Sequence, residues 1–362
     1  MAEDEKGGLG GLGSRLKNLI GGSEERPAAE VLPFGKSEDI AEDERPMFSV
    51  DPEWPTVTGG WVHDRCAIST SFEEVRSHTM AQVSQMRATV TTRADKMFLA
   101  SLYALLGERD LGLPEFPETP IRLDQLLKEE EPNSLQVMRC IEADPQLVGR
   151  VWQRARSARF PSAPSSLDMA VSRIGMVEVW RLSLESALDA IEIRPGMYKD
   201  MARQVRLHGA IVGDVTAALS GQRRGPGFLA GLLHDVGKLL ILQAASEHEP
   251  ELTTVRRILT ETHTSISVMI TDAWQLDPQI VPAVAFHPDP NSVEAGAKDL
   301  IRLLCLADIA VFGELDRRVK KNSNFLRALA KFTESRALAG KAMLSASQCI
   351  DRMEADGLKT VG

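Results

Sequence analysis

The sequence has few cysteines, few aromatic residues and no excess of positive charge, and each shortage excludes a class of protein. Its 362 residues include only four cysteines, at positions 66, 140, 305 and 349. They are far apart and match no metal-binding spacing, so we expect reduced thiols in a cytoplasmic protein. The net charge of −9 argues against binding to nucleic acid or to an acidic membrane surface. Aromatic residues make up 5%, so the core must consist mainly of aliphatic side chains, which favours helices over sheets.

The sequence also lacks signals for secretion or for a membrane span. It begins Met-Ala-Glu-Asp-Glu, the wrong charge for a signal peptide, and no apolar run approaches about eighteen residues. We therefore predict no stable membrane insertion. Two basic clusters, residues 150–159 and 317–321, are more typical of solvated helix faces than of phosphate-binding patches.

Four regions follow one another along the chain. Residues 1–70 are predicted to be a disordered acidic tail, because residues 23–53 contain ten acids, three bases and four prolines. Residues 71–110 are predicted to form one leading helix, since their first part contains neither proline nor glycine. Residues 111–312 form the main domain, and residues 313–362 a helical extension that packs on the domain or mediates association.

The main domain has strong helix signals and no strand signals. Asp144-Pro145 predicts a helix N-cap followed by proline in the first turn, and Ser165 or Ser166 can cap the next helix. Gly175 is expected to interrupt that helix. No period-two alternation and no Asn-Gly hairpin occurs in residues 113–312. The fold class is therefore predicted to be all-α, a multi-helix bundle.

A His-Asp pair, His234-Asp235, lies within the apolar segment of residues 228–241. Its leucines and valine predict a single buried helix, in which two adjacent polar residues need partners. Gly231 and Gly237 would let neighbouring backbones approach closely. A neutral imidazole and a carboxylate are both good ligands for a divalent transition metal.

Four further polar residues lie on apolar helix faces: His208, His263, His287 and Asp308. Each is placed by the helical period among aliphatic residues, so each is predicted to be buried. For any one of them a hydrogen-bonded core residue is the commoner explanation. Together with His234 and Asp235 they indicate a pocket that can hold a divalent metal such as manganese, iron, magnesium or zinc.

The order of these residues resembles that of the ligands in the HD superfamily of metal-dependent phosphohydrolases. The surrounding segments are still more similar to HDOD domains, the HD-related output domains of bacterial signalling proteins. Residues 113–120, 141–147, 170–175 and 228–238 carry this likeness. The resemblance implies an HD-superfamily-like bundle with metal-ligand positions at His208, His234, Asp235, His263, His287 and Asp308. It reaches neither the tail nor the last fifty residues.

Two functions are compatible with this resemblance. The first is a signal-transduction output module that binds a signalling protein partner or a small ligand, with self-association as a further expectation. The second is a metal-dependent phosphohydrolase, in which Lys238 would bind a phosphate; otherwise Lys238 is a lysine at a helix edge. The Gly-Tyr-Pro element of related cyclic-di-nucleotide phosphodiesterases is missing after His287, which argues against that activity and favours the module.

Overall fold

The computed structural model describes residues 72–113, 116–129, 133–157, 162–221, 225–276, 279–287, 299–320 and 336–355. All regular secondary structure in these residues is helical, as the sequence predicts. The predicted tail, residues 1–70, lies outside them. The helices are α3 (Phe72–Thr89), α4 (Arg93–Gly107), α5 (Glu118–Lys128), α6 (Ser134–Glu142), α7 (Pro145–Ala155), α8 (Leu167–Ile174), α9 (Met176–Asp189), α10 (Met197–Ser220), α11 (Pro226–Leu233), α12 (Val236–His248), α13 (Leu252–Ala273), α14 (Ile280–Phe286), α15 (Asp299–Lys320) and α17 (Arg336–Ala355).

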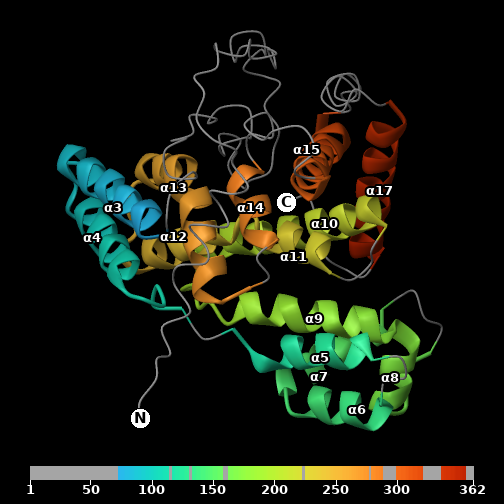
Figure 1. Ribbon diagram of the computed structural model, residues 1–362. Coiled ribbons are helices and arrows are strands. Elements are labelled where there is room, and N and C mark those ends of the chain that lie inside the picture. The colour runs from blue at the N-terminus through green and yellow to red at the C-terminus, as the bar shows by residue number, and fades with distance from the viewer. Residues whose placement is uncertain are drawn as a thin grey trace, which may run out of the picture.

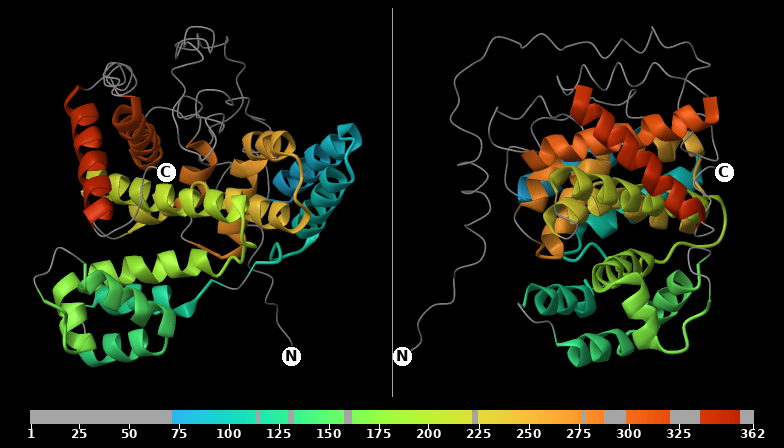
Figure 2. Two further views of the ribbon diagram at one scale, coloured as in Figure 1. Left: turned by 180° about the vertical axis from the view of Figure 1, so that it is seen from behind. Right: turned by 90° about the vertical axis from the view of Figure 1, so that its right-hand side faces the viewer.

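The helices form a smaller and a larger layer (Figure 1). The smaller layer consists of α5 to α9, which pack on one another. The larger layer is built around the long helix α10, which contacts α11, α12, α15 and α17. Two further views show α9 facing the larger layer and α15 and α17 lying together at one end of it (Figure 2). The candidate metal ligands all belong to the larger layer.

The predicted leading helix is two helices, α3 and α4, which pack against each other. The prediction of one helix was wrong because Thr92 begins a new helix. Its side chain accepts a hydrogen bond from the Asp95 backbone N–H at 3.0 Å, and the Asp95 carboxylate contacts its hydroxyl. Three other β-branched residues, Thr89, Val90 and Thr91, precede it and weaken the helix locally. Asp95 also accepts a hydrogen bond from the Glu251 N–H at 2.9 Å, which joins the pair to the start of α13.

The starts of α7 and α8 and the break between α8 and α9 follow the sequence signals. Asp144 caps α7 by accepting hydrogen bonds from two backbone N–H groups, and Pro145 occupies the first turn. Ser166, rather than Ser165, caps α8. Gly175 separates α8 from α9 with a φ of 86°, a conformation that disfavours residues with a Cβ atom. These three predictions are confirmed.

Glycines let α10 and α11 pack with their backbones nearly in contact. A Cβ atom on Gly231 would lie 2.5 Å from the Cα atom of Gly213, and one on Gly209 would lie 2.7 Å from the Leu232 carbonyl oxygen. Gly237 approaches α13 in the same way, since its Cβ would lie 2.2 Å from the His263 carbonyl oxygen. The predicted close approach at Gly231 and Gly237 is confirmed, and it draws α10, α11 and α13 around one centre.

One apolar segment, Pro226–His248, is long and apolar enough by composition to cross a membrane. It comprises α11 and α12, and 83% of its most apolar window is buried inside the protein. That degree of burial is typical of a core segment in a globular protein. The segment also carries the His-Asp pair at its centre.

Helix α17, in the predicted C-terminal extension, packs on α10 and α15. Its buried face includes Ala346, Cys349 and Ile350. Arg352 forms an ion pair with Asp214 of α10 at 3.6 Å. This part of the extension therefore contributes to the core of the larger layer.

Candidate metal centre

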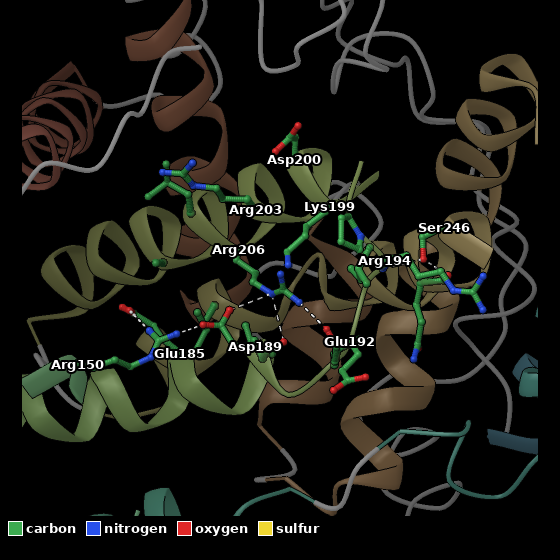
Figure 3. Close-up of a pocket in the computed structure, with 18 of the residues that line it drawn as sticks. Arg150, Glu185, Asp189, Glu192, Arg194, Lys199, Asp200, Arg203, Arg206 and Ser246 are labelled. Atoms are coloured by element: carbon green, nitrogen blue, oxygen red, sulfur yellow. Dashed lines mark hydrogen bonds and ion pairs between the residues drawn. The ribbon is translucent and has the colours of Figure 1, made fainter. Parts of the chain in front are cut away.

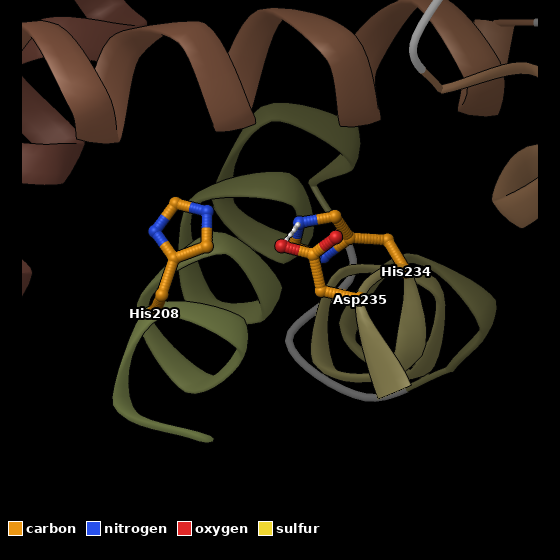
Figure 4. Close-up of side chains that lie close together, drawn as sticks. All are labelled: His208, His234 and Asp235. Carbon is orange, nitrogen blue, oxygen red and sulfur yellow. Dashed lines mark ion pairs between the residues drawn. The ribbon is translucent and has the colours of Figure 1, made fainter. Parts of the chain in front are cut away.

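Five structural elements contribute the predicted site residues. His208 lies in the middle of α10, His263 in α13 and Asp308 in α15, while His287 directly follows α14. His234 and Asp235 lie between α11 and α12. In Figure 4 the side chains of His208, His234 and Asp235 point toward one another from α10 and from this junction.

The His-Asp pair breaks the helix in which it was predicted to lie. α11 ends at Leu233 and α12 begins at Val236, with Asp235 at φ −106° and ψ 10°. The sequence prediction of one continuous helix was wrong. The apolar pattern of leucines and valine is the same for one long helix and for two helices joined by a turn, so it does not show the break. The turn carries both polar side chains to the same centre, where each finds partners from other helices.

One half of the centre surrounds Asp308. Its Oδ1 lies 2.7 Å from Nε2 of His208 and 3.6 Å from Nε2 of His234. The His234 Nε2 is in turn 3.3 Å from Oδ2 of Asp235. Ligand atoms of His208, His234 and Asp235 all lie within 4.8 Å of one another, close enough to share one metal ion.

The other half surrounds Asp235. Ligand atoms of Asp235, His263 and His287 form a second group within 4.8 Å, and Nε2 of His263 is 3.5 Å from Oδ1 of Asp235. Asp235 therefore belongs to both groups and can bridge two neighbouring metal positions. The structure thus brings the six predicted ligands together; that they bind a metal stays a prediction.

The histidine rings are oriented by their own helices. The Nδ1 atoms of His234, His263 and His287 lie 2.7, 2.6 and 2.6 Å from backbone carbonyl oxygens three or four residues earlier. A carbonyl oxygen can only accept, so Nδ1 carries the proton and donates it. The Nε2 atom then faces the centre, which is how metal-binding histidines are commonly held. This donor set fits a divalent transition metal.

Burial and charge divide the histidines into two kinds. Burial lowers the pKa of His208, of His263 to about 4 and of His287 to about 3. Burial acts on His234 in the same direction, but the carboxylates of Asp235 and Asp308 outweigh it and raise its pKa to about 10. The two carboxylates therefore stabilise the protonated form of His234, and a metal ion would have to displace the Nε2 proton to bind there.

Both carboxylates stay ionised despite their burial. Burial by itself would raise the pKa of Asp235, but Lys238 and His234 outweigh it and hold that pKa well below the usual range. For Asp308 the hydrogen bonds from His208 and His234 outweigh burial in the same way and lower its pKa. Two negative charges thus face two positive ones, on His234 and Lys238, so the buried centre is internally neutralised.

Lys238 lies at the edge of the centre, one helical turn after Asp235. Its Nζ atom is 2.6 Å from Oδ2 of Asp235, and its side chain is 14% exposed. His263 is 16% exposed, whereas the side chains of His208, His234, Asp235 and Asp308 are 8% exposed or less. Among the described residues, Lys238 and His263 are thus the part of the centre closest to solvent.

Three neighbours of the centre were not recognised as such from the sequence. Phe312 packs on the His208 ring with 4.8 Å between centroids, and the Thr264 hydroxyl lies 3.2 Å from Nε2 of His263. The Cys305 thiol donates a hydrogen bond to the His287 carbonyl oxygen. The helical period places Phe312 on the same face as Asp308, but its contact with His208 of α10 joins two elements and has no local signal. Cys305 contacts a residue from another element, which no sequence spacing indicates.

Comparison with known protein families assigns the central part of the chain to a family. Residues 113–290 match the family model described as the HDOD domain. This segment of the chain therefore belongs to the HDOD family, the class indicated by the sequence motifs. Asp308 and helices α15 and α17 lie beyond the matched residues but pack on the same core. A comparison with curated proteins found no match.

Solved structures similar to the chain share low sequence identity with it. One is a proposed metal-dependent phosphohydrolase from Shewanella amazonensis SB2B, with 20% identity, a TM-score of 0.49, and coverage of 72% of this chain and 99% of that one. Another is an HDOD domain protein of unknown function from Geobacter sulfurreducens, with 18% identity, a TM-score of 0.45 and coverage of 72% and 96%. A proposed signal transduction protein from Marinobacter aquaeolei VT8 has 18% identity, a TM-score of 0.47 and coverage of 80% and 67%.

Proposed function

We propose that the protein is a cytoplasmic signal-transduction output module, which binds a signalling protein or a small ligand. The observation that carries this proposal is the match of residues 113–290 to the HDOD domain, and the burial of the His-Asp centre supports it. Lys238 binds Asp235 at 2.6 Å and His208 binds Asp308 at 2.7 Å, so both carboxylates already have partners from within the chain. A hydrolase needs a metal with an open coordination position and a route for its substrate. A module needs only a well-packed body and an accessible surface.

The centre also suits a divalent metal with a structural role. The inward-facing Nε2 atoms of His234, His263 and His287 and the shared carboxylate of Asp235 are the atoms that would hold it. The net charge of −9 favours a protein partner or a second copy of the chain over nucleic acid or an anionic membrane.

The second candidate is a metal-dependent phosphohydrolase, and the two ligand groups that share Asp235 favour it. A bound metal would lower the pKa of a water molecule and polarise a phosphate ester. In this chain His263 and Lys238 would face the incoming ester, because they are the most exposed members of the centre. Lys238 would have to leave Asp235 to bind phosphate. Hydrolysis of a phosphate ester distinguishes the two candidates, because a module is expected to show none.

The metal itself is tested by elemental analysis of the protein purified without added metal. We expect about one or two divalent ions per chain, as two adjacent ligand groups allow. The content should fall sharply in His234→Ala and remain unchanged in His248→Ala, a histidine outside the centre. Equal metal content in the parent protein and in folded His234→Ala would show that the metal is bound elsewhere.

A further inference from the structure

A cavity of about 1080 Å³ lies between the two layers, and none of the six metal-ligand positions lines it (Figure 3). Its walls come from α7 and α9 on one side and from α10 and α12 on the other, with Met353 of α17. This volume lies just above the usual range for small-molecule sites, about 300–1,000 Å³. Its lining carries six basic and five acidic side chains, among them Arg150, Lys199, Arg206, Glu185 and Asp189.

Two guanidinium groups are fixed close together in this cavity. Arg206 donates hydrogen bonds to the Leu188 and Ile191 carbonyl oxygens, at 3.2 and 2.8 Å, which hold it across the gap between α10 and α9. Its Nε atom is also 3.3 Å from Asp189, which pairs with Arg150 as well. Asp189 therefore lies between the two guanidinium groups, and Arg150 is also 3.7 Å from Glu185. Guanidinium groups held close together in this way can bind an oxyanion through two parallel hydrogen bonds.

The acidic residues do not neutralise the cations on this side of the cavity. Asp189 is shared by Arg150 and Arg206, and its side chain is 40% exposed. Burial raises the pKa of Glu185 to about 7, so this carboxyl group carries only part of its negative charge near neutral pH. Lys199 makes no ion pair with any residue that the structure describes, and the Asp200 carboxylate points away from Arg206 (Figure 3). A surplus of positive charge therefore remains around Arg150, Lys199 and Arg206.

The rest of the cavity offers apolar surface and one hydrogen-bond acceptor. Leu207, Leu232 and Met353 form part of the lining. The Oε1 atom of Gln243, also in the lining, is buried and has no hydrogen-bond partner among the described residues. A buried acceptor without a partner is costly, so it favours a ligand that brings an N–H or O–H donor.

We propose that this cavity binds an organic phosphate of nucleotide size. Its phosphate lies against Arg150, Lys199 and Arg206, its ring-bearing part packs on Leu207 and Met353, and a donor group reaches Gln243. The proposal rests on the module function, because it specifies the small ligand that the module would bind. Because the cavity and the metal centre share no residue, nucleotide binding and metal binding can each fail without the other.

The experiment is calorimetric titration of the full chain with AMP and with GMP, with adenosine and inorganic phosphate as comparison probes. We expect at least one nucleotide to bind about tenfold more tightly than either fragment, because it alone contacts both the cationic and the apolar surface. Lys199→Met should weaken nucleotide binding by about tenfold through the loss of one charge-assisted hydrogen bond. Lys341→Met, at an exposed position of α17 outside the cavity, is the matched control and should not change it.

Absence of binding by both nucleotides overturns the proposal, and so does binding that persists unchanged in Lys199→Met. Nucleotide binding no tighter than that of inorganic phosphate also overturns it, because a surface cation pair would explain the result. Lys199 is exposed and anchors no backbone group, so its substitution leaves the fold intact. The metal content of the same samples reports separately on the His-Asp centre.

Discussion

At the scale of single residues, Asp235 contacts three other polar side chains of the centre. Its carboxylate lies within 3.5 Å of His234, Lys238 and His263, which come from both sides of the α11–α12 junction and from α13. It is 4% exposed, so solvent cannot replace these partners. Its removal leaves buried positive charge and buried donors without a partner.

Asp235→Ala is therefore expected to lower the free energy of unfolding, whether or not metal is bound. The expected loss is about 1–3 kcal/mol, the cost of leaving buried donors unpaired. Denaturant unfolding in the presence and absence of a chelator measures it, with the exposed Asp168→Ala as the comparison. A midpoint equal to that of the parent protein would show that the partners of Asp235 contribute nothing to stability.

Glu185 makes the free energy of unfolding depend on pH. Burial raises its pKa to about 7 against the combined action of Arg150 and Arg154 from α7, with Glu178 and Asp214 raising it further. The folded chain keeps a proton that the unfolded chain releases above about pH 4.5. The contribution of Glu185 to the free energy of unfolding is therefore full at low pH and is lost as the pH rises toward about 7.

Glu185→Gln is expected to remove that pH dependence. Between pH 5 and pH 8 the parent protein should lose about 1–2 kcal/mol more than the variant, since one pKa unit corresponds to about 1.4 kcal/mol. The side chain is 23% exposed, so solvent screening keeps the loss below the full value. Unfolding at the two pH values measures it, with Glu192→Gln as the control. Parallel losses in parent and variant would contradict the assignment.

At the scale of elements, close backbone contacts determine the shape of the centre. Gly237 lies two residues after Asp235, and its N–H donates a hydrogen bond to the Ser267 hydroxyl at 2.8 Å. A Cβ atom there would lie 2.2 Å from the His263 carbonyl oxygen and 2.6 Å from the Ser267 nitrogen. Both contacts are with the backbone of α13, which cannot yield as a flexible side chain can.

Gly237→Ala is accordingly expected to destabilise the protein by about 1–3 kcal/mol through overpacking, and to displace His263 from the centre. Gly340→Ala in α17 is the matched control, because its Cβ would meet nothing within 4 Å. That change should be neutral or should stabilise by up to about 1 kcal/mol, as alanine favours a helix. Thermal unfolding and metal content measure both. If the two variants were equally stable, α12 and α13 would be able to move apart to accommodate the added Cβ atom at no cost.

Several helix ends could be predicted from the sequence, and the two errors have physical reasons. Asp144 and Ser166 cap their helices through nearby backbone groups, so their signals are local. The break before Thr92 also had a local signal, because Thr92 and Asp95 have the spacing of a capping pair. The break at His234 and Asp235 had none, since its reason lies in partners from α13 and α15.

At the scale of the whole molecule, the sequence predicted which residues meet but not how they pair. The helical period identifies the buried face of each helix, and so it selected His208, His263 and Asp308. It does not say that His208 binds Asp308 at 2.7 Å, because that contact joins residues 100 positions apart. The cationic cavity was missed for the same reason. Arg150 and Arg206 belong to different layers, and Arg150 alone has the pattern of a solvated helix face.

The central claim is that the complete ligand set serves a module rather than a hydrolase, and phosphodiester turnover tests it most directly. The purified chain is supplied with manganese or iron and is assayed with cyclic dinucleotides and with a chromogenic phosphodiester. We predict no significant hydrolysis, because the Gly-Tyr-Pro element is missing after His287 and the centre is buried. Robust turnover that disappears in His234→Ala and in Asp235→Ala, with both variants still folded, would contradict the account and identify the protein as an enzyme.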